Sequence, residues 1–498
     1  MRKVGFGETP PADPFRIEFH IGSPPMKNLV LRNLVVLISL IAGQVATAQD
    51  ETKEVSVAIT PAAIPKAALE NPLLPPRLET TRGNAALLYL RAATMVSNLK
   101  SEMAEFRKKF GKYLDSPADE FAIEDARKDV EPFASALSEI RLAARRRQCE
   151  WQLPIEESGT QLYYVELPEM QALRDLARVL AVRIRIATHG GRINDAIDGL
   201  QTGFSMGQQV ADAPFLINSL VGVAVLETMS QRVLELAQTE NSPNLYWSLT
   251  SLPRPLVDMR QSMQFESESA MMVFPELAKA ETVSGEASRV DFENFVNRFE
   301  KLAVDSTNTD GPEYQLRKRL IDMLNDEAAM KDVRTFLETE GGFSKEAIAK
   351  MVPTQAVMIR ERILFTRLRD GLFVHSFLRF DQAQPGFDAW GDRYRHLQKE
   401  GKGLPLVALL LPGLDKACGV RARLQRRVEQ LRVIEALRAY ASANDGTLPN
   451  ALSDLTLPIS ENPADGKPFE YSLKDEKATL RTDDGTRFQI HYGIRIHK

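Results

Sequence analysis

A match to the nucleophile motif Gly-x-Ser-x-Gly is the sharpest catalytic signal in the sequence. It lies at residues 203–207 and would make Ser205 a nucleophile. Such a serine stands on a strained turn between a strand and a helix, where a histidine and an acid activate it. His375 and Asp381 are the candidates for that base and that acid. The motif therefore predicts a serine hydrolase, provided that a strand precedes it.

The residues in front of Ser205 do not have the pattern of a strand. Ile193, Ile197 and Leu200 recur at helical spacing, and Asp198-Gly199 interrupts what would be a buried strand. Glycines four residues apart on a helix also allow a second backbone to approach closely. We therefore expect Ser205 to lie on a packed helix, and we keep the serine hydrolase as the alternative hypothesis.

Other chemical constellations are weaker. The spacings His-Glu-x-x-His, Cys-x-x-Cys and Asp-x-Asp-x-Asp do not occur, so the sequence predicts neither a protein-built metal site nor a cofactor. His189 precedes two glycines and an arginine, which would suit a general base and equally an inter-helix turn. Cys149 and Cys418 would form a disulfide only if their Cα atoms lie within ~7 Å, so a bridge and two separate buried thiols both stay open.

Composition excludes several classes of protein. The chain has 498 residues, of which 44% are hydrophobic, enough for two or three structural units with buried cores. Its 63 Lys and Arg against 67 Asp and Glu give a net charge of −4, which argues against a dedicated nucleic-acid-binding protein. The ordinary composition also excludes collagen-like and wholly disordered chains.

Residues 26–48 have the three parts of a secretory signal peptide. A cationic start and an apolar core at residues 34–42 precede the small-residue cleavage site Ala46-Thr47-Ala48. The core is shorter than the ~20 residues of a bilayer-spanning helix, so we expect no stable transmembrane anchor. Residues 1–25, which contain five prolines, are interpreted as a misassigned start. The sequence thus predicts an exported protein, periplasmic or extracellular, although it does not decide whether the signal is cleaved.

The rest of the chain divides into three predicted parts. Residues 49–82 carry five prolines and no sustained apolar period, which is typical of an extended linker. Residues 84–415 place apolar side chains at three- and four-residue steps in segment after segment, which predicts an irregular multi-helix array. Within this array we expect a mobile connection at residues 280–312. Residues 416–498 are predicted to form a small, self-contained α+β module.

The predicted module combines one helix with a small sheet. Residues 421–443 carry an apolar stripe from Leu424 to Leu437 and many arginines, which we expect to face solvent. Three alternating runs near residues 469–473, 478–480 and 488–496 then predict a three-stranded antiparallel meander. The predicted fold class is therefore mainly α, with a C-terminal helix packed on that meander.

The junction between the helix and the sheet also carries a family resemblance. It contains Asn444-Asp445-Gly446-Thr447-Leu448-Pro449 and, after a short interval, Asn462-Pro463-Ala464-Asp465-Gly466-Lys467-Pro468-Phe469-Glu470-Tyr471. This segment, about residues 436–471, resembles the post-helix region of type II secretion major pseudopilins. The resemblance implies an α+β tail that makes lateral protein contacts. It does not imply assembly into a pilus, because the family's hydrophobic assembly helix and acidic calcium loop are not matched.

Taken whole, the chain is similar to a group of exported bacterial proteins of unknown function. The shared features are a helical body with a Cys-x-Trp element, here Cys149 and Trp151, and an apolar Leu-Pro-Gly-Leu entry at residues 411–414 that leads into the tail. This resemblance implies no activity.

Two clusters of arginines are the candidate anion-binding sites. Either cluster would present several guanidinium groups to an anionic polymer of the cell envelope, but solvated faces of amphipathic helices have the same composition. Both interpretations stay open. The clusters are Arg141, Arg145, Arg146 and Arg147, and Arg421, Arg423, Arg426 and Arg427.

These observations favour a binding function over a catalytic one. We expect a non-catalytic exported scaffold or binding protein whose partner is a protein of the cell envelope, reached through the arginine side of the last helix or through residues 446–468. The alternative is the serine hydrolase built on Ser205.

Overall fold

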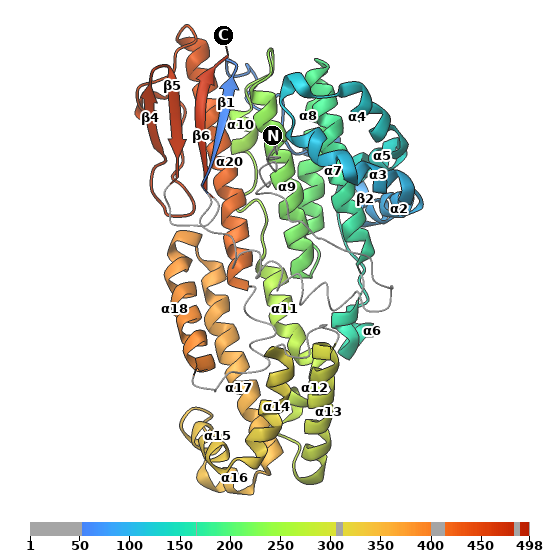
Figure 1. Cartoon of the computed structure of the whole chain (residues 1–498), viewed down its shortest axis with the longest axis vertical. Helices are drawn as coiled ribbons and strands as arrows, with labels where there is room; N and C mark the ends of the chain where they lie inside the picture. The colour runs from blue at the N-terminus through green and yellow to red at the C-terminus, as the bar shows by residue number, and fades with distance from the viewer. Residues whose placement is uncertain (1–51, 166, 305–311, 400–413, 483–488, 498) are drawn as a thin grey trace, which may run out of the picture.

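The computed structural model describes residues 52–497, apart from residues 166, 305–311, 400–413 and 483–488. The signal at residues 26–48 and the interpreted misassigned start lie outside this range. The described chain is mainly helical and has a small antiparallel meander near its C-terminus, so the predicted fold class is confirmed. The molecule is elongated, and the meander lies toward one end of its long axis (Figure 1).

The half of the molecule that contains the sheet is organised around helices α7, α8 and α9, which pack on one another. The apolar residues of α7 that recur at three- and four-residue steps, such as Leu173, Leu176 and Leu180, are buried. The helices of this half are α2 (Ala85–Asn98), α3 (Lys100–Asp115), α4 (Ile123–Val130), α5 (Ala134–Ala144), α7 (Pro168–His189), α8 (Ile193–Ala211), α9 (Leu216–Ala237) and α10 (Tyr246–Thr250). The short helix α6 (Ile155–Ser158) lies lower, toward the other half of the molecule (Figure 1).

Helices α11 to α18 form the other half. The prediction of a mobile connection over residues 280–312 is wrong for residues 285–304, which form helix α13. Its buried residues Phe292, Phe295 and Val296 supply an apolar stripe at helical spacing. The helices are α11 (Arg260–Val273), α12 (Pro275–Lys279), α13 (Gly285–Val304), α14 (Pro312–Asn325), α15 (Glu327–Thr339), α16 (Lys345–Lys350), α17 (Pro353–Phe373) and α18 (Phe380–Lys399).

The sheet has one strand more than the sequence predicts. The predicted meander is β4 (Glu470–Lys474), β5 (Lys477–Arg481) and β6 (Gln489–Ile496). The fourth strand, β1 (Thr52–Ile59), comes from the predicted Pro-rich linker and pairs in parallel with β6, which gives the order β1-β6-β5-β4. Val57 and Ile59 alternate inward and are buried. The start of the predicted linker is therefore part of the sheet.

A second, two-stranded sheet lies at one end of the helix pair α2 and α5, which we call the outer helices. Strand β2 (Thr81–Asn84) pairs in parallel with β3 (Arg146–Gln148). Because β2 leads into α2 while α5 leads into β3, the start of α2 lies near the end of α5 and the two helices run antiparallel. This pairing orders the chain on both sides of the outer helix pair.

The last long helix, α20 (Leu414–Ala443), is buried on both sides. It contacts α9 and α10, and in Figure 1 it stands between these helices and the sheet. Its apolar residues are buried as predicted, but Arg426, Arg432 and Arg438 are buried too. The prediction that the arginine side of this helix faces solvent is therefore wrong. A charged face becomes an interior face when another part of the chain supplies its hydrogen-bond partners.

We predict that residues 416–498 do not fold as an isolated fragment. The fragment would lack β1 beside β6 and would expose the polar side of α20, which the chain normally buries. Circular dichroism should show a cooperative thermal transition for residues 49–498 and none for the fragment. A fragment that unfolds cooperatively near the full-length temperature would contradict this prediction.

Candidate functional site

The structure places Ser205 in the interior of a helix. Ser205 lies in the middle of α8 and is only 5% exposed, and the residues before it in the sequence are helical. The flanking glycines make room for α9, because a Cβ atom added at Gly207 would lie 2.6 Å from the Cγ of Leu226, and one at Gly203 would overlap Met229. The Gly-x-Ser-x-Gly match is therefore a helix-packing pattern here, without the strand and turn of a nucleophile elbow.

His375 and Asp381 lie elsewhere, where α17 turns into α18. The ring of His375 packs against Gly386 and meets the ring of Phe387 edge to face at 5.7 Å. Asp381 accepts a hydrogen bond from Nε of Arg379 at 3.1 Å. Because α8 packs on α5, α7 and α9, the structure does not assemble these two side chains with Ser205 (Figure 1).

The two cysteines do not form a disulfide. The Cys149 thiol lies 3.5 Å from the carbonyl oxygen of Gln209, and the Cys418 sulfur lies 3.7 Å from the sulfur of Met263. Burial raises the pKa of Cys149 to about 12, so this thiol stays protonated at neutral pH. The structure thus has two separate thiols, of which Cys418 is buried and Cys149 is half-buried.

The first arginine cluster serves the outer helices and the small sheet. Arg141 and Arg145 both bind Asp198 of α8, at 2.7 and 2.5 Å. Arg146 donates to the carbonyl oxygen of Arg82 at 2.6 Å, and Arg147 donates to Oγ1 of Thr80. Each of these arginines thus ties β3 or α5 to a neighbouring element, although Arg141 remains half exposed.

The second arginine cluster is largely buried. Arg423 donates to Glu227 of α9 at 3.1 Å, while Arg426 and Arg427 are buried, with the guanidinium of Arg427 over the Tyr492 ring. Three of these arginines border a small cavity of about 10 Å³, room for about one water molecule. Arg426 and Arg427 are therefore not open to an anionic polymer, whereas Arg421 and Arg423 are half-buried.

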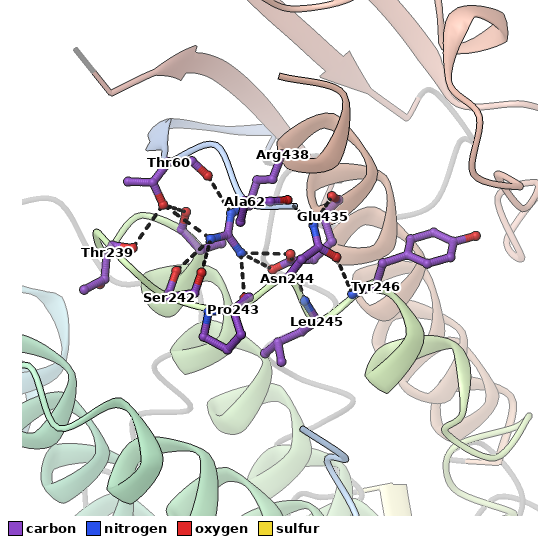
Figure 2. A network of polar contacts seen from close by, with 11 residues as sticks. Thr60, Ala62, Thr239, Ser242, Pro243, Asn244, Leu245, Tyr246, Glu435 and Arg438 are labelled. Carbon is purple, nitrogen blue, oxygen red and sulfur yellow. Dashed lines mark hydrogen bonds and ion pairs between the residues drawn. The ribbon is translucent and has the colours of Figure 1, made fainter. Parts of the chain in front are cut away.

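A buried ion pair in α20 lies at the centre of the polar network in Figure 2. Arg438 is 0% exposed and binds Glu435, one turn earlier, with Nη1 to Oε2 at 2.8 Å. Arg438 also donates through Nε to the carbonyl oxygen of Thr60 at 2.8 Å and through Nη2 to Oγ of Ser242 at 2.7 Å. The Arg438 guanidinium is thus hydrogen-bonded both to the residue after β1 and to the loop after α9.

The acidic partner and a nearby amide complete this network. Glu435 accepts from the backbone amide of Leu245 at 3.0 Å, and burial raises its pKa although Arg438 opposes that shift. The Asn244 side chain donates to the backbone carbonyls of Glu435 and of Ala62, at 2.7 and 3.2 Å (Figure 2). This site is not predictable from the sequence, because nothing in the pattern of α20 distinguishes Arg438 from a solvated arginine.

A second buried charge cluster surrounds Glu235 on α9. Its carboxylate binds Arg185 at 2.6 Å, His189 at 2.7 Å and Arg232 at 2.8 Å. Burial alone would raise the pKa of Glu235, but Arg232, His189 and Arg185 together lower it to about 2. His189, a candidate base in the sequence, is thus held by an ion-pair cluster whose Arg185 also donates to the backbone of Tyr113.

Four leucines in the region of α2, α5 and the small sheet remain exposed. Leu78 is 98% exposed in the 3₁₀ turn before β2, while Leu87, Leu90 and Leu142 on α2 and α5 are 61, 40 and 48% exposed. We call these four residues the leucine surface. Large apolar side chains gathered on one part of a protein surface are typical of an interaction site.

Comparisons with protein-family models, curated proteins and solved structures found no match. Within the described residues, no three or more His, Cys, Asp or Glu side chains are grouped so that they would hold a metal ion. The helices in the same part of the chain are too short or too polar to span a membrane.

We predict that Arg438→Met destabilises the protein by about 3–5 kcal/mol, because it leaves Glu435 buried without its cation. Adding Glu435→Gln should recover part of this loss, since the amide oxygen still accepts from Leu245 and no buried charge is left. The free energy of unfolding in urea measures both changes.

Arg395→Met is the matched control for this experiment. Arg395 binds Asp392 at the same helical spacing, but both side chains are exposed, so the variant should change the unfolding free energy by less than about 1 kcal/mol. Equal losses in Arg438→Met and Arg395→Met would contradict a special role of the buried pair.

Proposed function

We propose that the chain is a non-catalytic scaffold or binding protein of the exported compartment, with its partners in the cell envelope. The observation that carries this proposal is the contrast between the buried Ser205 and the exposed leucine surface. The only motif that suggested a nucleophile is part of a helix interface, whereas large apolar side chains face solvent elsewhere.

Rigidity supports the scaffold role. The Arg438 network ties the segment after β1 and the loop before α10 to α20, and the Glu235 cluster ties α7 and α9 to the chain around Tyr113. A surface held on such a frame binds with little loss of conformational entropy. The buried arginine side of α20 is not offered as a partner surface, which leaves residues 446–468 as the candidate protein contact in the tail.

The serine hydrolase remains the alternative to be tested. It requires Ser205 to leave the α8–α9 interface and to meet a histidine that lies on another helix pair in the structure. No described contact supports such a movement.

We predict that a serine-directed fluorophosphonate does not label the purified mature protein. A buried helical serine without a neighbouring base is neither accessible nor activated. In-gel fluorescence measures labelling, with a serine protease labelled in parallel as the positive control. Labelling that disappears in Ser205→Ala, while the thermal transition is kept, would establish the hydrolase and end the scaffold proposal.

Export has its own test. The signal-like order at residues 26–48 predicts that the mature chain begins at Gln49, after the Ala46-Thr47-Ala48 site. N-terminal sequencing of the protein from its native host should therefore give Gln49 as the first residue. A start before residue 40 would contradict cleavage at this site.

A further inference from the structure

The leucine surface is built on a helix pair whose geometry brings apolar side chains together. Arg91 of α2 binds Glu139 of α5 at 3.4 Å, and the two helices are antiparallel. Leu87 lies one turn before Arg91, and Leu142 lies about one turn after Glu139, so both leucines are at the same end of the pair. Leu90 neighbours Leu87 on the next turn, which extends the apolar ridge along α2.

The rest of the described chain leaves these leucines uncovered to different extents. Leu78, at 98%, extends from a turn beside the small sheet, where Thr80 binds Arg147 of β3. Leu87 is exposed on the outer side of α2, while Ala85, Ala86 and Tyr89 of the same helix are buried. A partner helix is received by an apolar groove, whereas exposed leucines suit insertion into a soft apolar layer.

The charges around these leucines are mainly positive. Residues 77–91 and 139–150 contain seven arginines against three glutamates. Arg77, Arg82 and Arg147 are exposed. The side chains of Arg91 and Arg141 are 63 and 55% exposed, although each of them binds a carboxylate. Even with Asp198 of α8 counted, the region keeps an excess of positive charge, which attracts an anionic surface.

We propose that this protein docks peripherally on an anionic lipid bilayer through the leucine surface, with the surrounding arginines at the level of the headgroups. Apolar insertion and attraction to anionic lipid together give reversible binding to a membrane interface. An acidic protein partner would also complement the arginines, but it would need a recess for its own apolar side chains. This inference goes beyond the proposed scaffold function, since it names a lipid surface as a partner.

The test measures co-sedimentation of the chain 49–498 with vesicles. Vesicles of phosphatidylcholine with about one-third phosphatidylglycerol should bind the protein, and vesicles of phosphatidylcholine alone should bind it at least tenfold less. Replacing Leu87 and Leu142 together by serine should lower the partition coefficient about tenfold or more, because two inserted leucines are lost. Arg82→Gln should lower it about fivefold at low salt and less at high salt.

A matched pair of exposed apolar residues serves as the control. Val374 and Leu378, in and directly after the 3₁₀ turn Val374–Phe377 between α17 and α18, are 53 and 43% exposed, and replacing both by serine should leave vesicle binding unchanged. All variants should keep the thermal transition of the parent chain. Absence of binding to anionic vesicles, or equal losses in the two serine pairs, would overturn the proposal.

Binding only to an acidic protein, with no partition into vesicles, would also overturn it. The fluorophosphonate result is independent of these measurements, so a failure of the lipid proposal is distinguishable from a failure of the scaffold proposal.

Discussion

A single buried guanidinium constrains the arrangement of this molecule. Arg438 is removed from solvent, so its charge must be balanced and its N–H groups bonded within the protein. Glu435 supplies the charge, and the backbone or side chains of Thr60, Ser242 and Pro243 supply the remaining acceptors. These acceptors come from the N-terminal segment and from the centre of the chain, so neither segment separates from α20 without breaking hydrogen bonds to the buried guanidinium.

The same requirement explains why α20 has two interior faces. Toward the sheet, Gln430 donates to the carbonyl oxygen of Ile490 and Arg427 lies over the Tyr492 ring, while on the side of α10 Arg432 donates to Thr250 and to the Tyr246 hydroxyl. Polar partners with fixed positions specify one arrangement of helix and sheet, because a shifted register would break several charge-assisted bonds at once. The tail is thus joined to the helical body by chemistry as well as by apolar contact.

The sequence allowed the helices and the meander to be predicted, because both follow from periodicity. The burial of the arginines of α20 was beyond such reasoning, since a periodic pattern does not reveal what packs on a charged face. Strand β1 was missed although Val55, Val57 and Ile59 alternate, because the neighbouring prolines indicated a linker. For Ser205 the helical spacing correctly predicted a packed helix, whereas the exposure of the leucines could be found only from the structure.

The parallel pairing of β1 with β6 joins the two ends of the described chain. Ile59 lies opposite Ile496, and the amide of His497 donates to the carbonyl oxygen of Ile59 at 2.8 Å. During synthesis β1 therefore emerges long before β6, its partner strand in the sheet. Contacts of such long sequence separation form late and slowly. The sheet is thus complete only when β6 has been made. A product truncated before β6 would display β1 as an unpaired strand, a feature prone to aggregation.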